Sequence, residues 1–222
     1  MAISLCRDQF EHFWDGEFGG FFFTADDGEA LITRQKEIYD GALPSGNSIS
    51  TLNILKIARL TGDPELEEKA ARMAVAFSPQ LSRHPASFSM HMNSLDFMLG
   101  PSFEIVIVGD KNSPETHRFL NALSSEYLPN KVVILKDEAN EREISKIAPY
   151  TQGHSPLNGK TAAYVCSNYE CRLPTDDPER MLELMGEGKA LIRPLSKGVY
   201  GRKNLFRLLT VRKTIEEPLI GP

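Results

Sequence analysis

Residues 40–73 read DGALPSGNSISTLNILKIARLTGDPELEEKAARM, and this stretch decides the fold of the first half of the chain. A loop of turn-forming residues precedes an amphipathic helix. The helix carries its apolar stripe at Ile49, Leu52, Leu55, Ile57 and Leu60. It ends at Thr61-Gly62, and a second helix begins with Asp63 as its N-cap and Pro64 at its first position. Because the connection is short, we expect the two helices to pack as an antiparallel hairpin.

Apolar residues at helical spacing extend on both sides of this hairpin. Residues 3–14 form one such stretch, and residues 85–99 form another before Gly100-Pro101. Between the first helix and the loop, Asp27-Gly28 lies between apolar or β-branched runs, which predicts a β-hairpin. Residues 21–23 are three phenylalanines that fit a strand buried on both faces.

The pattern changes after Pro101. Three short β-rich runs follow, FEIVIVGD from residue 103, KVVILKD from residue 131 and TAAYVCS from residue 161. Helices are predicted to begin at SPE, residues 113–115, and at DPE, residues 177–179. Because a helix separates the first two runs, we predict a small α/β unit with parallel strand pairing.

The predicted fold class is therefore mixed α/β, in three parts. Residues 1–100 form helical hairpins, residues 101–186 form a small α/β subdomain, and residues 187–222 form a basic tail to which we assign no structure. The tail holds eight Lys or Arg and three Asp or Glu, about +5, against a net charge of −5 for the whole chain.

Charge and apolar patterning exclude several classes of protein. A net charge of −5 argues against nucleic acid as a partner. No apolar run approaches the roughly 20 residues that span a bilayer, so we expect no membrane partner. Arg7 and Asp8 stand where a signal peptide would need an apolar core, and the 3 cysteines are too few for a disulfide framework. We therefore expect a cytoplasmic protein, or a mitochondrial matrix protein if a leader was lost.

The loop of residues 40–48 is the first candidate site. Its glycines and proline favour a turn, and Asn47 and Ser48 suit the opening of the following helix. A capped loop explains these residues on structural grounds alone. The functional interpretation is that Asp40, Ser45 and Asn47 face a cavity and hydrogen-bond a polyhydroxylated ligand.

Aromatic and acidic residues near the loop have the composition of a sugar site. Trp14 and Phe22 would supply aromatic faces, and Asp15 and Glu17 would supply carboxylates beside Asp40. Two carboxylates can divide the general acid and the nucleophile or base roles when they are held at a suitable distance. Surface acids that flank buried aromatic rings explain the same pattern.

Cys166 and Cys171 enclose four residues in CSNYEC. A redox pair usually has two intervening residues, and a structural zinc site needs two such pairs. Three interpretations stay open: two reduced thiols with one in the core, a disulfide across a turn, or a redox pair. Four histidines, at positions 84, 91, 117 and 154, show no metal-ligand spacing, so we expect no metal and no other cofactor.

Five segments in order resemble a known family. They are FWDGEFGGFFFTADD, LITRQKEIYDGALPSGNSISTLNILKIARLTGD, FEIVIVGD, LPNKVVIL and AAYVCSNYECRLPTDDP. Together they are similar to the C-terminal part of the thioredoxin domain-containing YyaL/spermatogenesis-associated protein 20 family. The resemblance spans residues from about 10 to 185.

The resemblance implies a longer architecture. Members of the family have a thioredoxin-like domain, then a six-hairpin (α/α) barrel similar to N-acylglucosamine epimerases and six-hairpin glycosidases, then a small α/β segment. This sequence would correspond to the last barrel hairpins and the closing segment, without the thioredoxin-like domain. The resemblance also implies a sugar-like small molecule as ligand and the remainder of the family architecture as partner.

We expect little or no catalysis from this chain alone, because part of a cavity cannot preorganise a transition state. An alternative is a thiol-redox or protein-interaction module that uses the α/β segment, with Cys166 and Cys171 as its redox residues. A third interpretation is a structural fragment with no role of its own.

Overall fold

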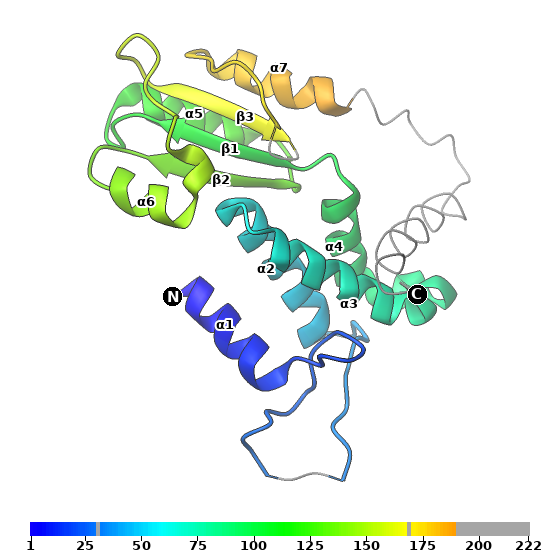
Figure 1. Cartoon of the computed structure of the whole chain (residues 1–222). Coiled ribbons are helices and arrows are strands. Elements are labelled where there is room, and N and C mark those ends of the chain that lie inside the picture. Colours follow the sequence, from blue (N-terminus) through cyan, green and yellow to red (C-terminus); the bar gives the residue numbers. More distant parts are fainter. Residues whose placement is uncertain (30–31, 168–169, 190–222) are drawn as a thin grey trace, which may run out of the picture.

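The computed structural model describes residues 1–29, 32–167 and 170–189 (Figure 1). The predicted basic tail, residues 187–222, lies outside this range except for its first three positions. The N-terminal half contains α1 (Ala2–Phe13), α2 (Gly46–Thr61), α3 (Pro64–Arg83), the 3-10 turn η1 (Pro85–Phe88) and α4 (Ser89–Leu99). The C-terminal half contains β1 (Phe103–Val108), α5 (Pro114–Ser125), β2 (Lys131–Lys136), α6 (Glu141–Ile147), η2 (Pro149–Thr151), β3 (Ala162–Ser167), β4 (Glu170–Cys171) and α7 (Pro178–Lys189). The mixed α/β class is confirmed.

The sheet has the strand order β2-β1-β3-β4. β1 and β2 pair in parallel, from Phe103 opposite Lys131 to Val108 opposite Lys136, as the α5 crossover predicts. The expectation of parallel pairing is wrong for β3, which runs antiparallel to β1. The segment between β2 and β3 passes through α6 and η2 on one face and returns β3 beside β1 in the opposite direction.

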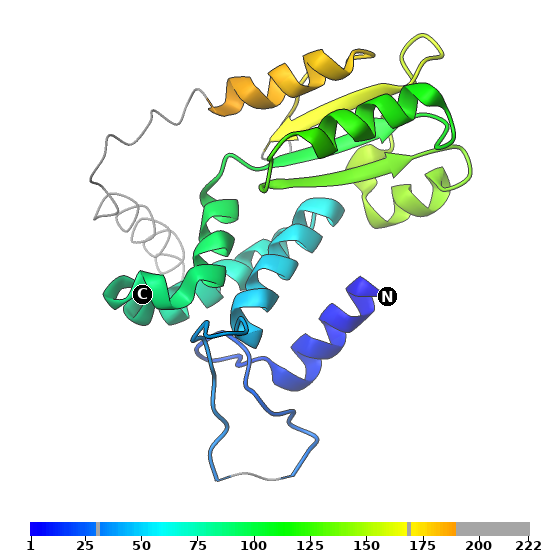
Figure 2. The same ribbon diagram turned by 180° about the vertical axis from the view of Figure 1, so that it is seen from behind.

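Each face of the sheet is covered by different helices (Figures 1 and 2). On one face, α5 and α7 bury a cluster that includes Ile105, Ile107 and Phe119. On the other face, α6, η2 and the end of α2 cover Val106 and Val108. All six residues of β1 are buried because β1 lies between two strands and two helical layers.

The helices of the N-terminal half pack around α2, which contacts both α3 and α4. The predicted hairpin of α2 and α3 is confirmed, with Asp63 accepting a hydrogen bond from the Glu65 N–H as the α3 cap. The predicted start of α2 is displaced. Ser45, rather than Asn47 or Ser48, is its N-cap, because the Ser45 side chain accepts from the Ser48 N–H.

The predicted β-hairpin is absent from residues 21–29 and 32–39, the described parts of this segment. Phe21 makes one isolated bridge with Trp14, and the Phe23 N–H donates to the Gln35 carbonyl at 2.8 Å. Phe21 is 3% exposed whereas Phe23 is 75% exposed, so the three phenylalanines are not buried on both faces. The Arg34 guanidinium donates to the Thr24 carbonyl and to the His12 carbonyl of α1, so this segment is held by side-chain contacts.

A buried ion pair joins the two halves of the molecule. The Arg59 guanidinium, near the end of α2, lies 3.2 Å from a carboxylate oxygen of Glu104 on β1, and Glu104 is fully buried. Arg59 Nε also lies 3.0 Å from Glu67 on α3. Charges removed from water require such partners, so this contact fixes the helical hairpin against the sheet.

None of the helices in the described ranges combines the length and apolar composition needed to cross a bilayer. The cytoplasmic location expected from the sequence stays a prediction.

Candidate functional site

Asp40 joins the predicted loop to α4. One carboxylate oxygen accepts from the Ser45 N–H at 2.9 Å. The other accepts from the Met90 N–H at 2.8 Å and the His91 N–H at 3.2 Å, in the first turn of α4. Backbone N–H groups at a helix start have no partner within the helix, and a negative charge there is favourable. Asp40 therefore caps α4 across the fold, a role that its sequence neighbours do not predict.

Ser45 and Asn47 are buried behind the same loop. Asn47 Oδ1 accepts from the Phe21 N–H at 2.7 Å, and its Nδ2 donates to the carbonyls of Phe21 at 2.9 Å and Glu37 at 2.8 Å. Ser45 Oγ donates to Ser48 Oγ at 2.9 Å. Asn47 thus holds two extended segments, residues 20–22 and 36–38, against the start of α2. Direct ligand contact by Asp40, Ser45 and Asn47 stays a prediction.

The two predicted aromatic residues lie in different surroundings. Trp14 packs against Phe10 and Phe21, each with ring centroids 5.2 Å from its own. The ring of Phe22 faces two cations, with the Arg34 guanidinium 4.3 Å and Lys36 Nζ 5.2 Å from its centre. Cations over an aromatic face are attracted by the ring quadrupole.

Asp15 lies close to these rings and is engaged internally. It forms an ion pair with Lys36 and accepts hydrogen bonds from the N–H groups of Glu17 and Phe18. Burial raises the pKa of Asp15, but the Lys36 hydrogen bond and the two N–H groups outweigh burial, so the pKa lies below its ordinary value. Asp15 is therefore ionised at neutral pH and fixes Lys36 in place.

A pocket of about 750 Å³ opens beside this network. Its lining is Phe23, Thr24, Thr33, Gln35, Lys36, Glu37, Ile38, Tyr39 and Phe88. Phe23 and Tyr39 are 75% and 59% exposed, so two aromatic rings that line the pocket are in contact with solvent. Aromatic faces with a few polar side chains are typical of small-molecule sites.

The predicted loop residues adjoin this pocket from behind. Asn47 binds the Glu37 carbonyl, and Asp40 follows Tyr39 directly. Sequence reasoning singled out the loop and missed the segment TRQKEIY, residues 33–39, that lines the pocket. The sequence offers no periodic signal there, because residues 33–37 are all polar, and the alternating exposure of the segment appears only in the structure.

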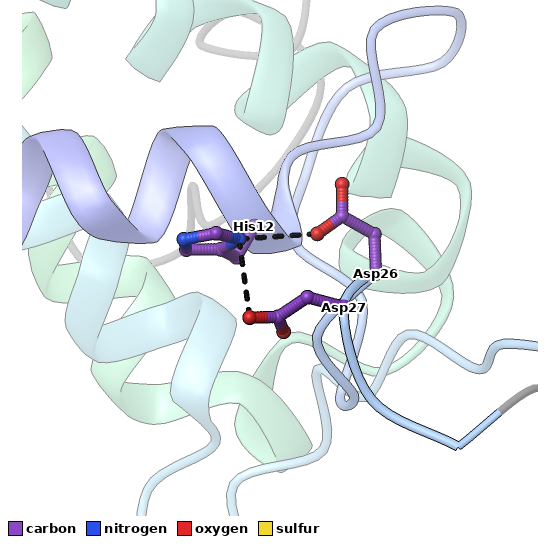
Figure 3. A group of neighbouring side chains, drawn as sticks. All are labelled: His12, Asp26 and Asp27. Carbon is purple, nitrogen blue, oxygen red and sulfur yellow. Dashed lines mark hydrogen bonds and ion pairs between the residues drawn. The ribbon is translucent and has the colours of Figure 1, made fainter.

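Three side chains that could ligate a metal ion meet at the end of α1 (Figure 3). His12 Nδ1 lies 3.1 Å from an oxygen of Asp26 and 3.8 Å from an oxygen of Asp27. The hydrogen bond with Asp26 raises the pKa of His12, because it favours the protonated ring. All three side chains contact solvent, and an ion pair explains their arrangement. The histidines considered in the sequence did not include His12.

Cys166 and Cys171 form a disulfide. The expectation of two reduced thiols is wrong, because antiparallel pairing of β3 and β4 places the two residues directly opposite each other. Cys166 is 1% exposed and Cys171 is exposed. Cys171 Sγ lies 4.0 Å from His154 Nε2. Cys6 is a free, buried thiol in α1.

Comparison with known proteins gives one group of relatives. No family model matches the chain. The chain is 33% identical to spermatogenesis-associated protein 20 of Homo sapiens over 185 residues, which is 83% of this chain and 24% of the human protein. The Rattus norvegicus and Mus musculus proteins of that name are 32% and 31% identical over the same share of this chain, and 23% of each is covered. The chain thus spans about a quarter of the length of these curated relatives.

Proposed function

Because this chain belongs to the spermatogenesis-associated protein 20 family and matches a C-terminal part of it, we propose that it contributes part of a carbohydrate-type binding site in a longer architecture. The pocket beside residues 33–39 is that contribution. Helices α1 to α4 are then part of an (α/α) barrel that other residues of the architecture complete. Catalysis would require those further walls.

The exposed aromatic pair at the pocket is the observation that carries this proposal. Phe23 and Tyr39 are more than half exposed, although apolar rings of this size are usually buried. Gln35 and Glu37 line the same pocket. An aromatic face stacks on the C–H side of a sugar ring, while amide and carboxylate oxygens accept hydrogen bonds from its hydroxyls.

Further apolar side chains of the helical half remain exposed. Leu5, Phe18 and Leu43 are 60%, 67% and 83% exposed. Leu5 lies on α1, and Phe18 and Leu43 lie in the loops between α1 and α2. We propose that they face the part of the family architecture that this chain does not match.

Binding of simple sugars tests the pocket. In two-dimensional amide NMR spectra, we expect hexoses and N-acetylhexosamines to shift residues 33–39 with a dissociation constant of about 1 mM, because an open site buries little ligand surface. Tyr39→Ala should weaken binding about tenfold by removing one stacking face.

Tyr127→Ala is the matched control, because Tyr127 is 88% exposed but lies at the end of α5 in the other half. It should leave the dissociation constant unchanged. If no sugar shifts the pocket residues at concentrations well above 1 mM, or if both variants weaken binding equally, the proposed site is wrong.

A further inference from the structure

The two sulfurs of the Cys166–Cys171 disulfide differ in access. Cys166 lies in β3, opposite Glu104 of β1, with 1% of its surface exposed. Cys171 lies in β4, at the edge of the sheet, and is exposed. Thiol–disulfide exchange requires an incoming sulfur to reach one sulfur of the bond. In this disulfide, that sulfur is Cys171 Sγ.

The disulfide closes a short local loop at the edge of the sheet. Its cysteines are only five residues apart in sequence. The chain after β4 is also held by backbone hydrogen bonds, from the Arg172 N–H to the Val165 carbonyl at 3.0 Å and between Thr175 and Ala163 in both directions. None of these hydrogen bonds involves a sulfur atom, so opening the disulfide removes none of them. Opening and closing are therefore compatible with one folded state.

His154 is placed beside the exposed sulfur. Its ring stacks on Tyr164, with centroids 3.9 Å apart and planes at 7°, and this stacking aims Nε2 at Cys171. Tyr150 meets the ring edge at 6.3 Å. His154 Nδ1 is buried without a hydrogen-bond partner among the described residues, which leaves Nε2 as the nitrogen that faces a reactive group.

The charged groups around His154 favour its neutral form. The Lys136 ammonium donates to the His154 carbonyl at 3.0 Å and pairs with Glu141 at 3.0 Å. Burial lowers the pKa of His154, and the Lys136 charge lowers it further. A neutral imidazole at pH 7 can accept a proton from a thiol.

We propose that Cys166 and Cys171 form a reversible dithiol–disulfide couple, with Cys171 as the sulfur that exchanges with external thiols and disulfides and His154 as the acceptor of its proton. The inference is independent of the sugar pocket. Its co-reactant is a low-molecular-weight or protein disulfide in one direction and a thiol in the other.

The oxidising direction balances in two steps. Cys171 gives its proton to His154 and attacks an external disulfide R–S–S–R′. A bond forms between Cys171 Sγ and the sulfur of RS, the RS–SR′ bond breaks, and R′S⁻ takes the proton from His154 and leaves as R′SH. The Cys166 thiol then attacks Cys171 Sγ, which forms the intramolecular bond and releases RSH. Two electrons pass from the protein dithiol to the external disulfide, which becomes two thiols.

A redox titration of the full chain tests the couple. The protein is equilibrated in buffers of reduced and oxidised glutathione, thiols are trapped by alkylation, and peptides are quantified by mass spectrometry. We expect Cys166 and Cys171 to pass reversibly from dithiol to disulfide in the folded protein, while Cys6 stays reduced. A bond that opens only when circular dichroism reports unfolding would overturn the proposal.

Single-cysteine variants identify the exchanging sulfur. With oxidised glutathione, Cys166→Ser should accumulate a mixed disulfide on Cys171, whereas Cys171→Ser should accumulate little on the buried Cys166. Equal trapping in the two variants would contradict the assignment of Cys171.

The alkylation rate of Cys171 tests the role of His154. In the reduced protein, His154→Gln should slow alkylation of Cys171 at pH 7 roughly tenfold and move the pH profile of the rate upward, because the thiolate is the reactive form. His117→Gln, which changes an exposed histidine on α5, is the control. It should alter neither the alkylation rate of Cys171 nor the pH profile of that rate. An unchanged profile in His154→Gln would exclude His154 as the proton acceptor.

Discussion

His91 is completely buried at the start of α4, and neither ring nitrogen has a hydrogen-bond partner among the described residues. Its ring meets the edge of Phe77 with centroids 6.0 Å apart. Burial lowers the pKa of His91 to about 4, although the Asp40 charge acts in the opposite direction. His91 therefore packs in the core as a neutral ring at pH 7. Its protonation destabilises the folded state.

This burial predicts a pH dependence of stability. The unfolded chain protonates His91 near pH 6.5 and the folded protein near 4, so unfolding takes up a proton between these values. The free energy of unfolding should fall by about 2 kcal/mol from pH 7 to pH 5 through this residue. His91→Phe keeps a ring of similar shape, and urea denaturation should show that it removes most of this loss.

His117→Gln serves as the control, because His117 is exposed and should leave the pH dependence unchanged. The same loss between pH 7 and pH 5 in wild type and His91→Phe would show that His91 does not titrate in this way.

At the scale of the element, the start of α2 organises the segment that lines the pocket. Ser45 caps the helix, and Asn47, the second residue of α2, binds the backbone at Phe21 and Glu37. Gly20 permits this approach, since a side chain there would collide with Phe77 at 2.7 Å and its φ is +82°. The start of α2 thereby holds the extended backbone at Phe21 and Glu37, which no regular β-ladder pairs in the described part of the chain.

Removal of the Asn47 amide should loosen that segment. Asn47→Ala leaves the Phe21 N–H and two carbonyls without their partner, and unpaired buried groups cost about 1–3 kcal/mol. We expect a stability loss of about 2 kcal/mol by urea denaturation and faster hydrogen exchange at the Phe21 amide. Asn53→Ala, at an exposed position of the same helix, should change little.

The same variant separates two roles of Asn47. If Asn47→Ala keeps wild-type stability and exchange but loses sugar binding, Asn47 contacts the ligand directly and its proposed role in holding the segment is wrong.

At the scale of the molecule, the sequence predicts individual helices and strands better than the contacts between them. The apolar periodicity of α1 to α4 and the β-rich runs of β1 to β3 are local signals, and the structure confirms them. Asp40 at the α4 terminus and the Arg34 contacts that replace a hairpin are contacts between distant segments. Spacing along the chain carries no information about such contacts.

The candidate site also depends on contacts between distant segments, which the sequence does not predict. Sequence placed it at the loop of residues 40–48, and the pocket lies one segment away at residues 33–39. The disulfide of Cys166 and Cys171 depends on the antiparallel direction of β3, which the crossover rule for parallel strands does not predict.

The ion pair between Arg59 of α2 and Glu104 of β1 should make the helical half and the sheet unfold together. Arg59→Met removes the cation that lies 3.2 Å from the fully buried Glu104 carboxylate, and loss of one member of a buried ion pair costs about 3–5 kcal/mol. Glu104→Leu should cost less, because Arg59 keeps its contact with Glu67. The double variant removes both charges and fills the space with apolar atoms, so it should recover most of that loss. Lys160→Met, which breaks an exposed pair with Asp176 at 3.5 Å, should cost less than about 1 kcal/mol.

Urea denaturation followed by far-ultraviolet circular dichroism and by Trp14 fluorescence measures these effects in both halves. Trp14 reports on the helical half, whereas the dichroism also reports on the sheet. Because Arg59 ties α2 to β1, the two signals should change together in the wild type and separate in the single variants. Losses that simply add in the double variant, or signals that already separate in the wild type, would show that this ion pair does not couple the helices to the sheet.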